Sequence, residues 1–381
     1  MHRWHALHDA WWRLAAQPQP RSLPDVLAAS VLETGSVAYG AVVHLRNAAY
    51  DRGWLEQARL PVPVISVGNV TVGGAGKTAC VELIAKKLIA RGRRVAVLSR
   101  GYGGLRRTHW LRCDGGRLSV DGDAGAAADG LADEPQLLAR HLEGTPVVVG
   151  ARRDRTGALA CGWFAPDALL LDDGFQHRRL WRDCEIVLVQ ARMPFGGWAL
   201  LPRGPMREPL ASLARAHVII VTKADEALER LAAMNERLRS LNHEAALVSA
   251  VHEAVGLFEA RSGQPQSVRR LEGLRVGLVS SIGDPLGFEA TVNGLQAAVL
   301  WHRSFPDHHR YSAADVAALQ EHVNRTRPDA VVTTEKDWVR LRSWIVDRGS
   351  WIAPFWVMEV RMKILTGEAE LDARLAALRA R

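Results

Sequence analysis

The stretch from Val64 to Thr78, VISVGNVTVGGAGKT, most constrains the fold of this chain, because an apolar run breaks into glycines and ends in Gly-Lys-Thr. Residues 64–67 are mostly β-branched or apolar and follow two prolines, which indicates a strand. Apolar residues then recur at helical spacing from Cys80 to Ile89, which predicts a helix that begins at the glycines. We therefore expect a strand, a glycine-rich loop and a helix in immediate succession.

A loop of this kind is suited to binding a polyphosphate. Its glycines let backbone N–H groups turn toward phosphate, Lys77 can reach the terminal phosphates, and the Thr78 hydroxyl can ligate Mg²⁺. The strict form of the motif has glycine at position 71, where this chain has Thr71. A glycine-rich turn without a ligand is the alternative. The predicted nucleotide-binding residues are Thr71, Val72, Gly73, Gly74, Ala75, Gly76, Lys77 and Thr78.

Length and charge bound the class of protein. A chain of 381 residues predicts two core-forming units, with room for an additional arm. The formal net charge of +8 indicates an anionic partner, and a nucleotide, a nucleic acid and acidic lipid headgroups all qualify. The four cysteines lack C-x-x-C spacing, which argues against a zinc site or a disulfide framework and favours a reducing compartment.

The N-terminal region indicates contact with a membrane. Trp4, Trp11 and Trp12 are of a type that favours bilayer interfaces. Residues 26–45 are long enough to span a bilayer, but the central acid Glu33 costs about 2.5 to 3.5 kcal/mol in a spanning helix. On a helix, Ser30, Glu33, Gly40 and His44 lie near one face, and Leu27, Val31, Ala38, Val42 and Leu45 lie on another. We therefore expect an amphipathic helix at the membrane surface. A helix packed on the protein's own core is the alternative. The start of the chain lacks the layout of a signal peptide, so we do not expect export.

Strand-like and helical segments alternate from Val64 to about Ser249, which predicts a parallel sheet covered by helices. The turn-rich segment 261–267 marks a break, and a second alternating series follows it. The predicted fold is therefore α/β, with a P-loop NTPase-like parallel sheet, a smaller second α/β domain and an N-terminal membrane-associated helix. The predicted bounds are 1–50 for the arm, 51–260 for the nucleotide-binding domain and 261–381 for the smaller domain that closes the cleft.

An acidic pair follows the predicted strand that ends near Leu171. A P-loop fold holds Mg²⁺ at such a position, so Asp172 and Asp173 are the candidate metal ligands. An acidic turn without a ligand is the alternative. His177 is a candidate for orienting a carboxylate or for contacting the substrate.

Two further clusters and two single residues supply groups that can act on a phosphate or a proton. Residues 305–311 hold an acid, two imidazoles and a phenol; a proton-transfer role is more economical than a metal site, because no third ligand follows at zinc-like spacing. Asp133 follows a glycine-rich loop and is a candidate counterpart for these imidazoles. Residues 203–209 present guanidinium groups on a loop that prolines stiffen, which suits phosphate binding. Lys336 adds a cation after a strand of the second series.

The segment 221–225, with Lys223 and Asp225 two residues apart, has the look of a guanine-reading loop. It supports an alternative function, a P-loop GTPase or metallochaperone that uses the histidines for metal. That alternative predicts GTP preference and stoichiometric binding of a transition metal. A third hypothesis, a peripheral membrane scaffold with a vestigial nucleotide site, predicts ATP binding without turnover.

Taken together, these motifs resemble the tetraacyldisaccharide 4'-kinases of lipid A biosynthesis. The matching segments are, in order, 71–78, Ser99–Gly103, Asp133–Pro135, Asp172–His177, Arg203–Pro209, Phe305–His309 and Thr334–Asp337. They cover roughly residues 25 to 345, and their joint occurrence is far more specific than any one of them. The family's phosphate loop also resembles this one at Thr71.

The resemblance implies transfer of the ATP γ-phosphate to the 4'-hydroxyl of an acylated glucosamine disaccharide 1-phosphate, with Mg²⁺, at the cytoplasmic face of the bacterial inner membrane. It implies a peripheral or monotopic enzyme whose partners are this lipid and the membrane surface and not a nucleic acid; the oligomeric state is left open. By motif, the catalytic residues are Asp133, His308, Lys77 and Arg207; the metal ligands are Thr78, Asp172, Asp173 and Glu208; the substrate contacts are Arg153, Gln176, His177 and Lys336. His308 is chosen over His309 from the family motif alone.

Overall fold

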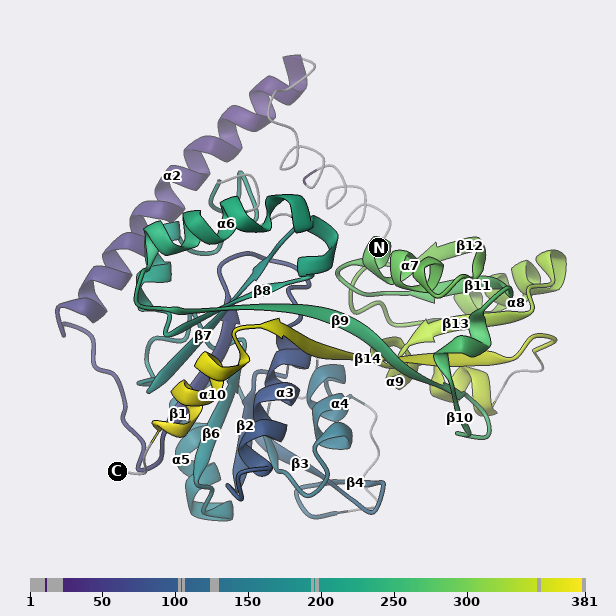
Figure 1. Cartoon of the computed structure of the whole chain (residues 1–381), viewed down its shortest axis with the longest axis horizontal. Coiled ribbons are helices and arrows are strands. Elements are labelled where there is room, and N and C mark those ends of the chain that lie inside the picture. The colour runs from purple at the N-terminus through teal and green to yellow at the C-terminus, as the bar shows by residue number, and fades with distance from the viewer. Residues whose placement is uncertain are drawn as a thin grey trace.

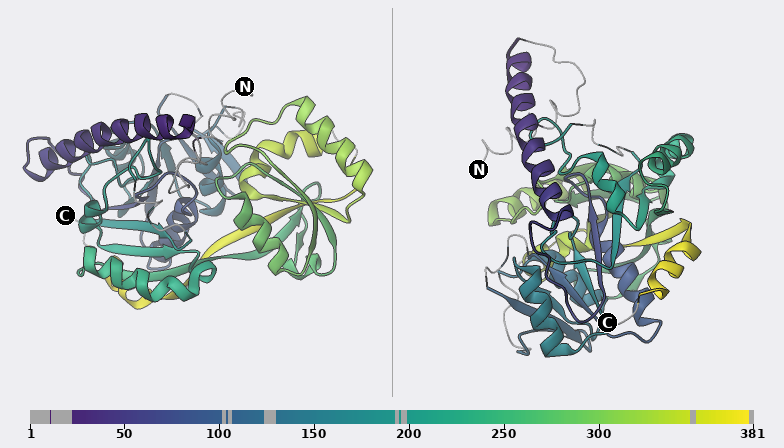
Figure 2. Two further views of the ribbon diagram at one scale, coloured as in Figure 1. Left: turned by 90° about the horizontal axis from the view of Figure 1, so that it is seen from above. Right: turned by 90° about the vertical axis from the view of Figure 1, so that its left-hand side faces the viewer.

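The computed structural model describes residue 11 and residues 23–101, 104, 107–123, 130–192, 195, 199–347 and 351–378. Two α/β units lie next to each other, joined by a long two-stranded ribbon, and a long helix lies along the larger unit (Figure 1). Figure 2 shows the same arrangement from two other sides, with the N-terminal half of that helix projecting beyond the body. Within the described residues, the strands of both units form one continuous sheet of 14 strands.

The larger unit is built on a parallel sheet in the order β8-β7-β1-β6-β2-β5, followed by the antiparallel pair β3 and β4. Its strands are β1 (Val64–Asn69), β2 (Val95–Ser99), β3 (His109–Asp114), β4 (Arg117–Val120), β5 (Val147–Val149), β6 (Ala168–Asp172), β7 (Cys184–Gln190) and β8 (Val218–Thr222). Its helices are α3 (Lys77–Ile89), α4 (Asp133–His141), α5 (Arg153–Phe164) and α6 (Leu228–Leu241), with short turns of helix at Leu210–Arg215 and Ala224–Ala227. The parallel strands are buried on both faces, as their apolar runs predict.

The smaller unit has three parallel strands, β11 (Arg275–Ser280), β12 (Ala298–Ser304) and β13 (Ala330–Thr334). Its helices are α7 (Pro285–Gly294), α8 (Ala313–Thr326) and α9 (Glu335–Arg342), with short helical turns at Val268–Leu271 and Ser343–Asp347. Two buried clusters, one on each side of this sheet, form its core, and they are separate from those of the larger unit. The second alternating series in the sequence therefore forms a unit with a core of its own.

The ribbon consists of β9 (Ala246–Glu259) and β14 (Phe355–Thr366), which run antiparallel. β9 also pairs with β8, β14 also pairs with β13, and the short β10 (Pro265–Gln266) pairs with β9. The last helix, α10 (Glu368–Ala376), returns to the larger unit, where Leu371 and Leu375 are fully buried in the core beneath the phosphate loop. The C-terminal helix thus packs with the first unit, and not with the second, to which the sequence assigned all of 261–381.

The N-terminal helix α2 (Leu23–Asp51) rests on the body by one face only. Residues 36, 40, 43 and 47 are buried, at the i, i+4, i+7, i+11 spacing of one helical face. On the opposite side Leu27, Val31, Val42 and Leu45 form an apolar stripe, and each is between 62% and 72% exposed.

In the described part of the chain, residues 24–51 are long and apolar enough to cross a membrane, with a mean hydropathy of 1.6 in their most apolar window. Only 22% of that window is buried, which is unlike a core helix. The predicted N-terminal helix is present, and its apolar stripe lies on the side away from the body. Of the three N-terminal tryptophans, Trp4 and Trp12 lie outside the described residues, whereas the Trp11 indole donates to the carbonyl of Pro202 at 2.5 Å.

Candidate active site

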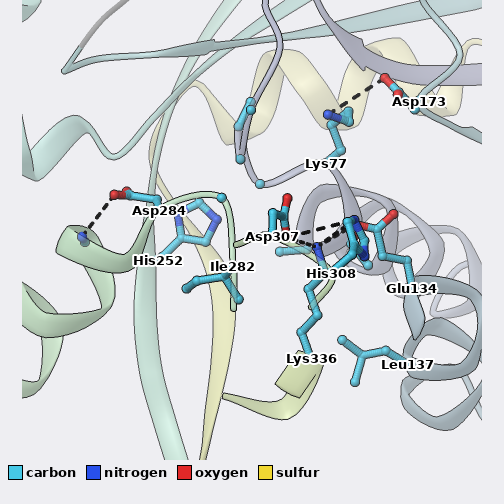
Figure 3. A pocket seen from close by; sticks show the side chains of 18 of the residues that line it. Lys77, Glu134, Leu137, Asp173, His252, Ile282, Asp284, Asp307, His308 and Lys336 are labelled. Atoms are coloured by element: carbon cyan, nitrogen blue, oxygen red, sulfur yellow. Dashed lines mark hydrogen bonds and ion pairs between the residues drawn. The ribbon is translucent and has the colours of Figure 1, made fainter. Parts of the chain in front are cut away.

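A cavity of about 910 Å³ lies between the two units. In Figure 3, Lys77 and Asp173 lie together in the larger unit, and Glu134, Asp307, His308 and Lys336 form a second group nearby. The ribbon strand β9 adds His252 to the wall. Because polar groups from both units face this one space, it is the candidate active site.

The phosphate loop has the geometry that its sequence predicts. β1 ends at Asn69, α3 begins at Lys77, and Gly76 caps the helix with a φ of 83°. Gly73 and Gly76 both adopt left-handed backbone conformations, which favour glycine. Residues 73–78 line the cavity, with the first N–H groups of α3 and its positive dipole end facing it. Thr71 and Val72 hold the loop in place. Thr71 forms an isolated antiparallel β-bridge with Met206, and the N–H of Val72 donates to the carbonyl of Pro205 at 2.7 Å.

The acidic pair lies beside this loop because β6 is the parallel neighbour of β1, with Val67 opposite Asp172. The Asp173 carboxylate accepts a hydrogen bond from Arg207 at 2.9 Å and lies 3.8 Å from the Lys77 ammonium. Burial alone would raise the pKa of Asp173, but Lys77 and Arg207 hold it below its usual value. Asp173 therefore presents a charged carboxylate to the cavity.

Asp172 is 3% exposed and accepts a hydrogen bond from the Ser99 hydroxyl at 3.2 Å. Burial, together with the nearby charges of Glu134 and Asp173, raises the pKa of Asp172 to about 7. A divalent cation beside Asp173 would favour the ionised form of Asp172 and reverse that shift.

Asp133 and His308 meet across the boundary between the units. Asp133 is the first residue of α4, and its Oδ2 lies 3.4 Å from Nδ1 of His308 in the loop after β12. Lys336, from α9, places its Nζ 3.4 Å from Nε2 of His308 and 3.1 Å from Glu134. His309, in contrast, pairs with Asp315 of α8 at 3.1 Å. The geometry thus favours His308 over its neighbour as the partner of Asp133.

Three predicted substrate contacts line the same cavity, and two of them, Arg153 and Gln176, are anchored by hydrogen bonds. The Arg153 guanidinium donates to the carbonyls of Gly150 and Ala151, and burial lowers its pKa to about 10. The Gln176 amide donates to the carbonyl of Asn69 at 2.9 Å. Burial and the charge of Arg153 lower the pKa of His177 to about 4, so this imidazole is neutral at physiological pH.

Glu208 does not lie where a metal ligand is needed. It is fully buried, and its oxygens accept hydrogen bonds from Arg46, Asn47 and Arg215 at 2.9 to 3.1 Å. Both carboxylate oxygens therefore already accept hydrogen bonds, and those from Arg46 and Asn47 link α2 to the larger unit. The expectation that Glu208 binds metal is not met by this geometry, whereas its neighbour Arg207 does face the cavity.

The segment that looks like a guanine-reading loop is engaged in a contact between the units. Lys223 has a φ of 56°, and its ammonium pairs with Asp284, the residue that caps α7. Among the described residues, no group of three or more His, Cys, Asp or Glu side chains is arranged to hold a metal ion. The GTPase or metallochaperone alternative therefore gains no support.

Sequence reasoning missed a ring of buried charges at the edge of the cavity. His141 of α4 lies 2.7 Å from Glu82 of α3 and 2.6 Å from Glu335 of α9. Arg361 of β14 closes the ring, at 3.0 Å from Glu82 and 2.6 Å from Glu335. The four residues come from four different elements, and even the two nearest in sequence, Glu335 and Arg361, are 26 positions apart, so local pattern carries no signal for them. Burial would lower the pKa of His141, but the two carboxylates raise it to about 9.

This ring predicts a pH-dependent contribution to stability. A histidine whose pKa is raised from 6.5 to about 9 stabilises the fold fully below about pH 6.5, and that contribution is lost as the pH rises through about 9. We expect His141→Gln to lower the free energy of unfolding near pH 6 by up to about 3 kcal/mol, and the difference from wild type to shrink near pH 10. Denaturant unfolding at both pH values measures it. A difference that stays constant with pH would contradict the role of the charged imidazole.

A phosphate loop at the end of a central parallel strand, an adjacent carboxylate and an acid–imidazole pair define a P-loop phosphotransferase. The model of the Tetraacyldisaccharide-1-P 4'-kinase family matches residues 28–379. The chain therefore belongs to this family.

Two relatives and one solved structure illustrate the match. The chain is 41% identical over 379 residues to a tetraacyldisaccharide 4'-kinase of Anaeromyxobacter dehalogenans, which covers 97% of this chain and 95% of the relative. It is 38% identical to a protein of the same name from Syntrophus aciditrophicus, with 92% and 94% covered. A crystal structure of the family member from Aquifex aeolicus in complex with ATP matches with a TM-score of 0.69 and 28% identity, over 92% of this chain and 98% of that one.

Of the motif Ser99–Gly103, residues 102 and 103 lie outside the described residues.

Proposed function

We propose that this protein is an ATP-dependent kinase that phosphorylates the 4'-hydroxyl of tetraacyldisaccharide 1-phosphate to give lipid IVA. The observation that carries the proposal is that one cavity is lined by the phosphate loop, Asp173 and His308, and that His308 pairs with Asp133. Family membership supports the acceptor, and ATP is the nucleotide bound by the solved relative. The division into a nucleotide-binding unit and a closing unit is part of the same proposal.

The residues of this chain divide the work of phosphoryl transfer between the two units. Lys77 and Arg207 lie beside the phosphate loop and can neutralise charge on the transferred group. Asp133 orients His308 through Nδ1, which leaves Nε2 to take the proton of the sugar hydroxyl. Arg153, Gln176, His177 and Lys336 line the cavity as candidate substrate contacts.

The donor groups at the loop suit Mg²⁺. Thr78 lines the cavity, and Asp173 presents carboxylate oxygens there. Asp172 is the residue that precedes Asp173 in the chain. Oxygen donors of this kind, one or two carboxylates plus phosphate, are what Mg²⁺ prefers. When bound, the ion would offset negative charge on the nucleotide phosphates. We propose Thr78, Asp172 and Asp173 as its protein ligands.

The proposed enzyme works at the cytoplasmic face of the inner membrane, with α2 as its peripheral or monotopic attachment. The apolar stripe of α2 faces away from the body, and the basic charge of the chain favours anionic lipid surfaces. A lipid acceptor requires the enzyme to bind at the membrane surface, because the acyl chains of the lipid remain in the bilayer.

The stripe predicts the effect of adding charge to it. We expect Val31→Asp with Val42→Asp to weaken binding to anionic vesicles about tenfold or more, since two exposed apolar side chains that would contact the bilayer become charged. Ser30→Asp with His44→Asp adds the same charge on the polar side of the helix and is the matched control. Sedimentation with vesicles measures both, and equal binding by the two double variants would contradict the assignment.

The position of phosphorylation tests the function. The full chain is incubated in detergent micelles with disaccharide 1-phosphate lipid, Mg²⁺ and either ATP or GTP. Phosphorus NMR of the product should show a second phosphate monoester, located at the 4' carbon, with ATP as the better donor. A phosphate on another hydroxyl, or turnover of GTP without any lipid product, would contradict the proposal.

A further inference from the structure

Arg340 lies where the two units meet and faces the proposed catalytic pair directly. It belongs to α9 of the smaller unit, and its side chain is 10% exposed. Its Nε lies 3.2 Å from Oδ2 of Asp133, an ion pair by distance that lacks the angle of a hydrogen bond. The same oxygen faces Nδ1 of His308 at 3.4 Å. One carboxylate oxygen of the larger unit therefore lies against both a guanidinium and an imidazole of the smaller unit.

Groups of the smaller unit hold the guanidinium in place. Nη1 of Arg340 donates to the backbone carbonyl of His309 at 2.9 Å, and Nη2 donates to Oδ1 of Asp337 at 3.2 Å. His309 follows His308 in the chain, so Arg340 contacts the loop that carries the His308 imidazole. It also contacts the Asp133 carboxylate, which that imidazole faces. The planar fork of arginine makes this possible, and an ammonium group could not reproduce all three contacts.

Asp337 ties the same loop to Arg340. Its carboxylate is fully buried and accepts hydrogen bonds from the backbone N–H of Ser281 at 3.0 Å and from the Tyr311 hydroxyl at 3.1 Å. The carbonyl of Ser281 in turn accepts the backbone N–H of His308 at 3.2 Å. A single buried carboxylate thus sets the positions of both Arg340 and the loop of His308.

The contacts of His308 define which of its nitrogens can accept a proton. Nδ1 faces the Asp133 carboxylate, which can only accept when ionised, so a hydrogen on Nδ1 points to Asp133 and Nε2 is left as the acceptor. Nε2 lies 3.4 Å from the Lys336 ammonium and 3.9 Å from Oδ1 of Asp307. This tautomer needs an ionised Asp133 in a fixed orientation. The Arg340 guanidinium places a positive charge 3.2 Å from this carboxylate.

We propose that Arg340 is a positioning residue for phosphoryl transfer, which holds the Asp133 carboxylate in place across the boundary so that His308 presents Nε2 to the sugar hydroxyl. The inference rests on the proposed kinase function and adds to it a residue that contacts the catalytic pair. It also makes the pair dependent on the approach of the two units, because Arg340 and Asp133 come from different ones.

The test is the pH dependence of kcat for Arg340→Gln, measured as phosphate transfer to the lipid in micelles. We expect kcat near pH 7.5 to fall about ten- to hundredfold while the KM for ATP changes less than about threefold, because the nucleotide contacts remain. The acid limb of the profile should move to higher pH, because removing the neighbouring cation makes it easier for the catalytic pair to bind a proton.

Two further variants separate positioning from packing. Arg340→Lys keeps a cation near Asp133 and should recover part of kcat and bring the acid limb back toward wild type. Arg342→Gln, at the exposed end of the same helix, should behave as wild type. An unchanged kcat for Arg340→Gln, or an equal loss in both Arg340 variants with an unshifted acid limb, would overturn the inference. If wild type itself transfers no phosphate to lipid, the proposed function is wrong, and the role of Arg340 in it is wrong as well.

Discussion

Lys77→Ala is expected to lower phosphate transfer to the lipid by about 10²- to 10³-fold, the loss found when one preorganised charge is removed from a transition state. The Lys77 ammonium is the cation of the phosphate loop, within 3.8 Å of Asp173 and 3.3 Å of Asn69. Alanine removes the positive charge where the γ-phosphate develops negative charge, while the loop glycines keep their conformation. Initial rates at saturating ATP measure the effect.

Lys363→Ala is the control for this variant, because Lys363 lies on the ribbon with a 56% exposed side chain. It removes the same charge without touching the loop and should leave the rate unchanged. A rate for Lys77→Ala within a few fold of the control would show that the loop is not the site of transfer. Thermal unfolding of both variants confirms that the fold is intact.

Asp133→Ala is expected to lower kcat by about 10²- to 10⁴-fold with little change in the KM for ATP. Asp133 contacts His308 and Arg340 of the smaller unit and is 13% exposed, so its loss affects the proton acceptor and not the nucleotide. The kcat and KM values at several ATP concentrations separate these effects. A change confined to KM would remove Asp133 from the chemistry.

The double variant Asp133→Ala with His308→Ala tests whether the two residues act as one base. Groups that act as a unit are strongly non-additive, so the double variant should lose about as much activity as the more damaging single variant. Losses that multiply would mean that the two side chains act independently, in spite of the 3.4 Å contact between them.

The parts of the fold that local pattern specifies were predictable from the sequence. The strand, loop and helix at 64–89 follow from apolar spacing and glycine, and the parallel strands appear as continuous apolar runs. The short pair β3 and β4 and the return of α10 to the larger unit were not predicted, because their packing depends on distant partners.

The candidate site was predictable only as a set of motifs. The phosphate loop and Asp172–Asp173 meet because their strands are neighbours in the sheet, which an α/β pattern implies. Arg340 was missed because its partner Asp133 lies far away in sequence and the contact depends on the ribbon that joins the units. Glu208 was assigned to metal from the family motif alone, but Arg207 faces the cavity whereas the next side chain, Glu208, points into the body.

The central claim is that this cavity moves the γ-phosphate of ATP to the lipid, and one measurement tests it most directly. ATP radiolabelled at the γ-phosphate is incubated with Mg²⁺, the disaccharide 1-phosphate lipid in micelles and either wild type or Lys77→Ala, and the lipid fraction is separated and counted. Labelled lipid with wild type that disappears with the variant is the predicted result. An unlabelled lipid fraction from a folded wild-type protein that binds ATP would contradict the account.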